Sequence, residues 1–263
     1  MKEISIIIPL STRLRVRHAD NCLNSIKSQL LPPGYSLEII ISFTYLSSQT
    51  EGGVNRNQSE IEALAKKYGA TLFVKRDCSP EYSLAFARNV GGMRSKGAIL
   101  GFVDCDLVLH PQTLKYAIQY MSHVSAVAVH CFRMKEGPEN PIYRDLKNFD
   151  NHLVLGKRDD AGKGGCFFID RSLFLRMHGY DERFYGWGYE DVDMLNRLSS
   201  RQIMVGYLLS EGIYAMHQYH EPNTWSSDER AEKNRLMVYS SSDFVRNPKG
   251  FAGLSLDMCE KIG

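Results

Sequence analysis

Short apolar runs alternate along this chain with longer segments in which apolar residues recur every three or four positions. The first three runs are rich in β-branched and aromatic residues, which is typical of strands: Ile4–Ile8, Leu37–Phe43 and Thr71–Val74. The segments between them have helical spacing, as at Leu23 and Ile26. This alternation, without a repeat or a low-complexity linker, predicts an α/β fold with a doubly wound, mostly parallel sheet flanked by helices in a single domain.

The same pattern continues beyond the third run. It predicts a helix over 83–96, a strand over 99–103, a helix over 111–121, strands over 126–132 and 166–169, a short helix over 172–177, a helix starting near 190 and a strand over 213–215. Residues 133–160 are charged and contain Pro and Gly. Two interpretations of them stay open, a plain surface loop or a mobile segment over a site.

Two carboxylates follow the strand predicted over 99–103. Asp104 and Asp106 are separated by one residue at the point where the apolar run ends. Oxygen ligands at the mouth of a strand can hold Mg²⁺ or Mn²⁺, and such a cation neutralises a diphosphate. The pair alone is weak evidence, because Asp-x-Asp also occurs in turns whose carboxylates cap backbone N–H groups.

Basic residues follow the first strand, which we expect Pro9 to end. They are Arg13, Arg15, Arg17 and His18. In an open parallel sheet, ligands bind at the carboxyl ends of the strands, so an anionic ligand there is one interpretation and solvated loop charges are the other.

The helix predicted over 83–96 carries Arg88 and Asn89 just before Gly91 and Gly92. Glycine weakens a helix, so the pair of glycines indicates a close approach of another backbone or of a ligand. Arg88 is a candidate to bind such a ligand, and its other interpretation is an ion pair with a surface carboxylate.

A second informative stretch runs from Gly164 to Leu198. In it, an aromatic residue stands between two glycines, and the helix that follows has Val192, Leu195 and Leu198 at helical spacing. Glu190 and Asp191 therefore lie in its first turn, where the helix dipole favours an ionised carboxylate. A carboxylate there could act as a general base beside an aromatic platform; the other interpretation is helix capping by acids with the aromatic in the core.

Composition narrows the class of protein. The 263 residues are 43% hydrophobic and 24% charged, as expected for a globular domain, and the net charge of +2 is spread over 32 basic and 30 acidic residues. This argues against a dedicated nucleic-acid binder. The six cysteines have no zinc-type spacing, which favours reduced thiols in the cytosol. No apolar run approaches the roughly 20 residues of a membrane span, so we expect at most peripheral membrane contact.

Four motifs carry a family resemblance: Ile-Ile-Ile-Pro at 6–9, Arg88-Asn89, Asp104-Cys105-Asp106 and the Gly-Trp-Gly-Tyr-Glu-Asp segment at 186–191. Their order resembles the nucleotide-sugar glycosyltransferases of the GT-A fold, in the family 2-like branch with the β-1,4-galactosyltransferases and the bacterial chondroitin polymerase. The resemblance covers about residues 3–222. It implies a GT-A domain over 1–222, with a donor half of about 1–110 and an acceptor half of about 111–222. We expect 223–263 to form a helical extension packed on the same domain.

The resemblance also implies site residues and a divalent metal, Mn²⁺ or Mg²⁺. The expected donor-binding residues are Pro9, Arg13, Arg88, Asn89, Asp104 and Asp106. The expected acceptor-binding residues are Gly165, Trp187, Gly188 and Glu190. The expected metal ligands are Asp106, which is favoured over Asp104 as a direct ligand, and His220, which is favoured over His217. The Met-x-x-His spacing of the galactosyltransferases is not kept here, since Tyr219 stands at its last position.

The implied reaction is transfer of a sugar from a UDP-sugar, such as UDP-Gal, UDP-GalNAc or UDP-GlcNAc, to a hydroxyl of a glycan. Asp191 would be the base of an inverting attack and Glu190 would bind the acceptor. Ser42-Phe43-Thr44 replaces the uracil-reading Asp pair of many relatives, so the base of the donor must be recognised by other groups. The rivals are a retaining GT-A transferase, a metal-dependent phosphohydrolase with Asp104 as nucleophile, and a non-catalytic sugar-nucleotide-binding module.

By analogy with bacterial enzymes that build cell-surface glycans, the expected acceptor is an oligosaccharide or a lipid-linked glycan. The expected location is the cytoplasm, at most at the inner face of the membrane.

Overall fold

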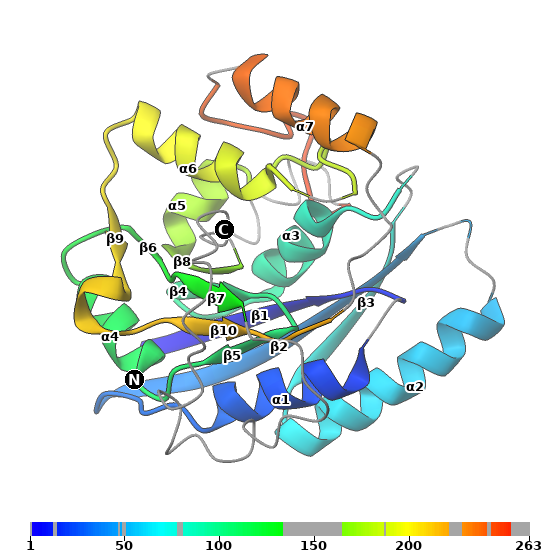
Figure 1. The fold of residues 1–263 in the computed structure, drawn as a ribbon, viewed down its shortest axis with the longest axis horizontal. Coiled ribbons are helices and arrows are strands. Elements are labelled where there is room, and N and C mark those ends of the chain that lie inside the picture. The colour runs from blue at the N-terminus through cyan, green and yellow to red at the C-terminus, as the bar shows by residue number, and fades with distance from the viewer. Residues whose placement is uncertain are drawn as a thin grey trace.

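The computed structural model describes residues 2–12, 15–46, 48, 51–77, 81–133, 165–186, 188–220, 228–240 and 243–253. It is a mixed α/β fold with a mostly parallel central sheet (Figure 1). The fold class predicted from the sequence is thereby confirmed. No helix in the described ranges combines the length and apolar character that crossing a bilayer requires.

The central sheet has seven strands in the order β3-β2-β1-β4-β8-β6-β9. Their bounds are β1 Lys2–Leu10, β2 Tyr35–Leu46, β3 Thr71–Asp77, β4 Ile99–Val103, β6 Ala126–Ala128, β8 Cys166–Asp170 and β9 Val205–Tyr207. The first four strands in chain order are parallel, and β8 is antiparallel to both of its neighbours. The parallel half places the carboxyl ends of β1 and β4 at one edge, where the Asp-x-Asp motif follows β4.

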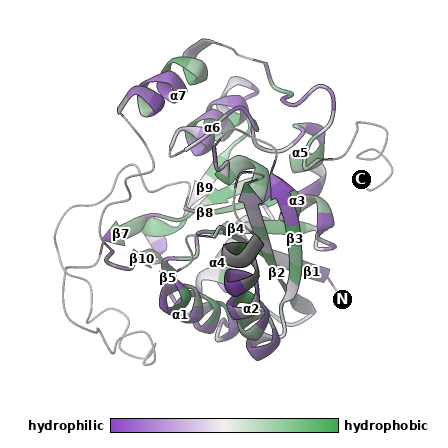
Figure 2. Ribbon diagram, turned by 90° about the vertical axis from the view of Figure 1, so that its right-hand side faces the viewer, coloured by the Kyte–Doolittle hydropathy of each residue, from purple (hydrophilic) through white to green (hydrophobic). Residues whose placement is uncertain are grey.

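Helices cover both faces of this sheet. The helices are α1 Val16–Lys27, α2 Glu51–Tyr68, α3 Leu84–Arg94, α4 Thr113–Tyr120, α5 Arg171–Arg176, α6 Glu190–Ser200 and α7 Asp228–Ser240, with a 3₁₀ turn over Leu208–Glu211. In Figure 1, α1 and α2 lie on one side of the sheet, and α3, α5 and α6 on the other. Figure 2 shows apolar residues along the strands and hydrophilic residues on the outer sides of α1 and α2.

The core is therefore divided by the sheet. Ile6 and Ile8 of β1 pack into a cluster with α1, α2 and α4, while Ile7 packs into a second cluster with α3, α5 and α6. Successive strand residues point to opposite faces, so a continuous β-branched run serves two cores at once.

A second sheet brings the Asp-x-Asp turn and the segment around His217 together. Its three short strands are β5 Leu107–Leu109, β7 Cys131–Arg133 and β10 Ala215–His217, in the order β5-β10-β7. In the antiparallel pair, His217 lies opposite Leu107. Residues that are more than 100 positions apart in the sequence thus become neighbours of the Asp-x-Asp turn.

The structure corrects several predicted elements. The single strand expected over 126–132 is two strands, β6 and β7, which belong to different sheets. The strand expected over 213–215 is β10, two residues later, and β1 continues past Pro9 to Leu10. An apolar run does not reveal where a chain leaves one sheet for another, because both strands are buried.

The buried face of α6 is also different from the predicted one. Leu198 is fully buried, as predicted, but Val192 and Leu195 are only half-buried. The fully buried face carries Asp193, Met194 and Arg197. Charged residues occupy this face because they are paired, as Arg197 Nε donates to Asp193 Oδ2 at 2.8 Å.

The glycines of α3 mark a close approach, but of side chains and not of the backbone or ligand that the sequence predicted. A Cβ added at Gly91 would lie 2.3 Å from Ile7 Cγ2, and one at Gly92 would lie 2.7 Å from Phe174 Cε1. The approaching groups are core side chains of β1 and α5. Helix α3 can therefore sit close to the sheet, which fixes the position of Arg88.

We expect Gly91→Ala to lower the free energy of unfolding by about 1–3 kcal/mol, the usual cost of overpacking a core. Urea denaturation would measure the loss. The double variant Gly91→Ala with Ile7→Ala should lose less free energy of unfolding than the two single variants lose together, because the clashing methyl of Ile7 is then absent. Simple additivity would show that the close approach is not the cause.

Candidate functional site

The Asp-x-Asp turn is built where β4 ends and β5 begins. Asp104 N donates to Gly165 O at 2.8 Å, and Leu107 N donates to Asp104 O at 3.1 Å. A Cβ at Gly165 would lie 3.2 Å from Asp104 Oδ2, so a larger residue would press on that carboxylate. Gly165 thus supports the turn, and the structure places it beside Asp104.

Asp106 lies with two histidines in a group that could hold a metal ion. Its Oδ2 is 3.2 Å from His220 Nε2 and 3.5 Å from His217 Nε2. One ligand atom from each of the three residues can be chosen so that all lie within 4.8 Å of one another. The backbone fixes this arrangement, because Gln218 N donates to Asp106 O at 2.9 Å.

The chemistry of this donor set fits a divalent cation. Asp106 Oδ1 is buried and receives no hydrogen bond from any residue that the structure describes. Although burial opposes ionisation, the hydrogen bond with His220 and the charge of His217 lower the pKa of Asp106 below its ordinary value. Two imidazoles with a carboxylate suit Mn²⁺ better than Mg²⁺, which prefers oxygen ligands.

Helix α1 supports the histidine segment from the side. Asn21 Nδ2 donates to Gln218 Oε1 at 2.9 Å, and Gln218 Nε2 donates to His18 O at 3.1 Å. His18 Nε2 lies 2.9 Å from Tyr219 O. Such contacts orient metal ligands from behind.

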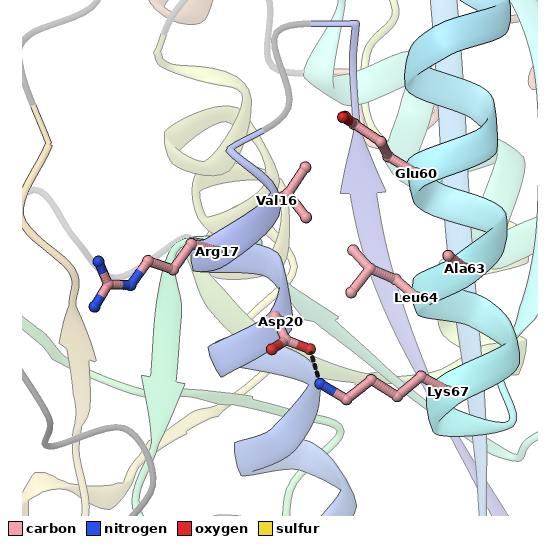
Figure 3. Close-up of a pocket in the computed structure, with 7 residues that line it drawn as sticks. All are labelled: Val16, Arg17, Asp20, Glu60, Ala63, Leu64 and Lys67. Atoms are coloured by element: carbon pink, nitrogen blue, oxygen red, sulfur yellow. Dashed lines mark hydrogen bonds and ion pairs between the residues drawn. The ribbon is translucent and has the colours of Figure 1, made fainter.

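Asn21 and Gln218 were not predicted as site residues, and His18 was considered only as a loop cation. The only sequence signal for Asn21 and His18 is their place as polar residues on the amphipathic helix α1, and Gln218, which follows β10, has no such signal. Arg17, by contrast, lies on the exposed side of α1. It lines a surface pocket between α1 and α2 with Glu60 and Lys67 (Figure 3).

Arg88 joins the two halves of the site. Its Nη2 lies 2.8 Å from Asp104 Oδ1, and its Nη1 lies 2.9 Å from Glu190 Oε1. The side chain is only 1% exposed. Burial alone would lower the pKa of Arg88, but Asp104, Tyr180 and Glu190 raise it well above its ordinary value. The guanidinium is therefore a permanent charge that both carboxylates balance.

Glu190 and Asp191 begin α6 and differ in environment. Glu190 is 6% exposed and is held by Arg88, whereas Asp191 is half-buried. Burial and the neighbouring Glu190 raise the pKa of Asp191 to about 6, against the effects of Arg88 and of the hydrogen bond from Val192 N. The helix dipole alone would lower this pKa, so burial outweighs the effect expected from the sequence.

Asp104 has a raised pKa too. Burial, opposed by Arg88 and reinforced by Asp106, raises the pKa of Asp104 to about 6. Within the described residues, Asp104 is not a member of the three-residue metal group. The two aspartates of one motif therefore have different partners, Arg88 for Asp104 and the histidines for Asp106.

Asn89 is occupied by the protein itself. Its Nδ2 donates to Tyr180 O at 2.9 Å and to Glu182 Oε1 at 2.8 Å, and its Oδ1 accepts from Tyr180 N at 2.8 Å. It is fully buried. The structure thus places Asn89 behind the site, where it holds the segment that leads to Gly186.

The other expected site residues have varied surroundings. Pro9 is buried in β1 opposite Ser42, whose Oγ donates to Ala87 O at 2.7 Å. Gly188 has a φ of +91°, and a Cβ there would meet no atom within 4 Å. The expected residues Arg13 and Trp187 lie outside the described residues.

Removing Arg88 should leave buried carboxylates without their counter-charge. We expect Arg88→Met to lower the free energy of unfolding by about 3–5 kcal/mol, the range for breaking a buried pair. Adding Glu190→Gln should recover part of this loss, because the amide needs no counter-charge. Urea denaturation of both variants tests this, and an Arg88→Met protein as stable as wild type would contradict it.

Two family models match the chain. One, described as glycosyl transferase family 2, matches residues 54–184, and the other, described as the N-terminal domain of galactosyltransferase, matches residues 157–221. Human β-1,4-galactosyltransferase 4 is 28% identical over 89 residues, which are 30% of this chain and 26% of that protein. The matched segment thus spans about a quarter of the length of this relative.

Solved structures share the fold at low sequence identity. The catalytic domain of Drosophila β-1,4-galactosyltransferase 7, in complex with xylobiose, has a TM-score of 0.55 at 16% identity and covers 89% of this chain and 80% of its own. The mannosyltransferase PcManGT of Pyrobaculum calidifontis, with GDP-Man and Mn²⁺, has a TM-score of 0.57 at 16% identity, with 90% and 63% covered. GalNAc-T7, with UDP, GalNAc and Mn²⁺, has a TM-score of 0.59 at 16% identity, with 90% and 48% covered.

Proposed function

Because the chain belongs to the galactosyltransferase-like glycosyltransferases of the GT-A fold, we propose that it moves a hexose from a nucleotide-diphosphate sugar to a glycan hydroxyl with inversion. The observation that carries this proposal is the Arg88 bridge, which joins Asp104 of the Asp-x-Asp turn to Glu190 of the helix that begins with Glu190-Asp191. The buried guanidinium of Arg88 thereby sets the distance between a donor side and an acceptor side.

On the donor side, Asp106, His217 and His220 would hold Mn²⁺. When bound, this ion supplies charge neutralisation for the diphosphate as the sugar–oxygen bond breaks. Asp104 is held by Arg88 and would face the sugar nucleotide. Arg13 and the backbone at Pro9 complete the proposed donor contacts.

The donor is proposed to be UDP-Gal, UDP-GalNAc or UDP-GlcNAc. Support comes from the match to the galactosyltransferase model and from GalNAc-T7, which was solved with UDP. GDP-mannose is the competing donor, since PcManGT was solved with it. Because Ser42 Oγ donates to Ala87 O, the base has to be read by other groups.

On the acceptor side, Asp191 is proposed as the base. It is the more exposed of the two acids, and its pKa of about 6 leaves it ionised at neutral pH yet basic enough to take a proton. Glu190 would orient the acceptor, together with Gly165, Gly188 and Trp187. An ionisable Asp191 on this face favours inversion over the retaining alternative.

An oligosaccharide or lipid-linked glycan is the proposed acceptor, in the cytoplasm or at the inner face of the membrane. Among the described cysteines, the thiols of Cys22, Cys105 and Cys166 are free, which suits a reducing compartment. Incubation with UDP-Gal, UDP-GalNAc, UDP-GlcNAc and GDP-Man, each with Mn²⁺, tests the function. Nucleoside diphosphate release that increases with a monosaccharide or disaccharide acceptor supports it, and no release from any donor contradicts it.

Asp106→Ala should abolish the Mn²⁺-dependent part of donor binding, because the carboxylate that joins the two histidines is lost. Calorimetric titration of UDP with and without Mn²⁺ measures this. A matched control is Asp20→Ala, which removes a half-buried acid of α1 that pairs with Lys67. Undiminished metal-dependent affinity in Asp106→Ala would refute the metal assignment.

Asp191→Asn should lower kcat by roughly 10²–10⁴ with little change in donor affinity, because the amide cannot accept a proton. Glu190→Gln should mainly raise the acceptor KM, since part of its interaction exists in the ground state. At saturating donor, wild-type kcat should fall about tenfold per pH unit below pH 6, where Asp191 becomes protonated. Steady-state kinetics and NMR of the product anomer measure these effects. Near wild-type turnover in Asp191→Asn, or a retained configuration, would favour the retaining alternative.

A further inference from the structure

Helix α7 contacts the turn that leads into α6. It lies outside residues 54–221, the part of the chain that the family models match. In Figure 1, α7 is placed above α6 and α3. Its Asn234 is only 2% exposed. A buried amide requires hydrogen-bond partners, and these partners show what the helix holds.

The partners of Asn234 are backbone carbonyls on either side of Trp187. Asn234 Nδ2 donates to Tyr185 O at 2.9 Å and to Gly188 O at 3.1 Å. Both N–H groups of one amide can thus fasten the two ends of the turn. An ion pair between Arg230 and Glu81 connects α7 to the segment that precedes α3.

The turn is a strained segment that needs such support. Gly186, Gly188 and Tyr189 have φ angles of +71°, +91° and +76°. Tyr189 is not a glycine, so its left-handed conformation persists only where the surroundings enforce it. It directly precedes Glu190, so relaxation of the turn would move the start of α6.

The opposite side of the turn is fixed by the chain before α3. Gly186 N donates to Tyr82 O at 2.9 Å, and Ser83 Oγ donates to Phe184 O at 2.9 Å. These contacts hold residues 184–186. Asn234 adds the contact to Gly188, which lies between that anchor and the two acids.

We infer that Asn234 is a positioning residue, which fastens the 185–188 turn and thereby sets the acceptor side of the site, so that α7 is part of the transfer machinery. The assignment to the acceptor side rests on the proposed function, whereas the fastening of the turn does not. Asn234 acts through the backbone of the turn, where its bonds to Tyr185 O and Gly188 O lie just ahead of the two acids.

Asn234→Asp is the most informative variant, because it keeps the shape of the side chain but places a carboxylate, which has no N–H donors, against the two carbonyls. Asn234→Ala removes the side chain, and Lys233→Ala is the matched control on the exposed side of α7. Hydrogen–deuterium exchange should rise at least tenfold in residues 184–192 of Asn234→Asp and Asn234→Ala, remain unchanged in β4, and remain unchanged everywhere outside α7 in the control.

Kinetics test the acceptor assignment. With N-acetylglucosamine or xylobiose as acceptor, Asn234→Asp should raise the acceptor KM about tenfold, while the affinity for UDP with Mn²⁺ stays within twofold. Unchanged exchange in 184–192, or an equal rise in β4, would overturn the fastening of the turn. Equal losses of UDP affinity and of acceptor use would overturn the acceptor assignment. If wild type releases no nucleoside diphosphate from any donor, the proposed function fails, and the exchange result still decides whether Asn234 fastens the turn.

Discussion

The rest of the site depends on the buried charge of Arg88. A guanidinium that is 1% exposed has lost its water and needs compensating carboxylates. It finds them on two elements that are far apart in the sequence, Asp104 after β4 and Glu190 at the start of α6. Because Asp104 binds Nη2 and Glu190 binds Nη1 of the same buried guanidinium, the ion pairs fix the distance between the two halves. The glycines of α3, which let this helix lie close to β1, decide where that charge is placed.

The metal group depends on a different constraint, the pairing of β5 with β10. Asp106 is adjacent to β5 and His217 ends β10, so strand pairing brings them together before any ion binds. The hydrogen bond from Gln218 N to Asp106 O and the contacts with α1 then hold the segment that carries His220. A preorganised ligand set of this kind avoids an ordering cost when a cation binds.

Local patterns predicted the sheet well and predicted side-chain partners poorly. The runs that became β1, β4 and the middle of β2 are apolar because both faces are covered, and the sequence pattern detects this directly, whereas the edge strand β3 is partly exposed. The same logic misplaced the inner face of α6, where Asp193 and Arg197 are buried as a pair and Arg246, 53 residues away from Asp193, adds a second bond at 2.7 Å. The partners of Asn89 and Gln218 could not be predicted either, because an amide in a sequence does not show which distant backbone group it will bind. The residues that carry the resemblance could be recognised by their order, but their division of roles required the geometry.

That division is clearest for Glu190 and Asp191, which are adjacent and chemically similar. Glu190 is held by Arg88, so its negative charge is already used to balance a cation. Asp191 lies next to that fixed negative charge and is partly buried, and both effects raise its pKa to about 6. A carboxylate in the ordinary range is a weaker base, and a more strongly raised one would be protonated at neutral pH. Glu190 therefore contributes to the basicity of its neighbour while the charge of Arg88 moderates it, and the buried guanidinium acts on the proposed proton transfer without touching the proton.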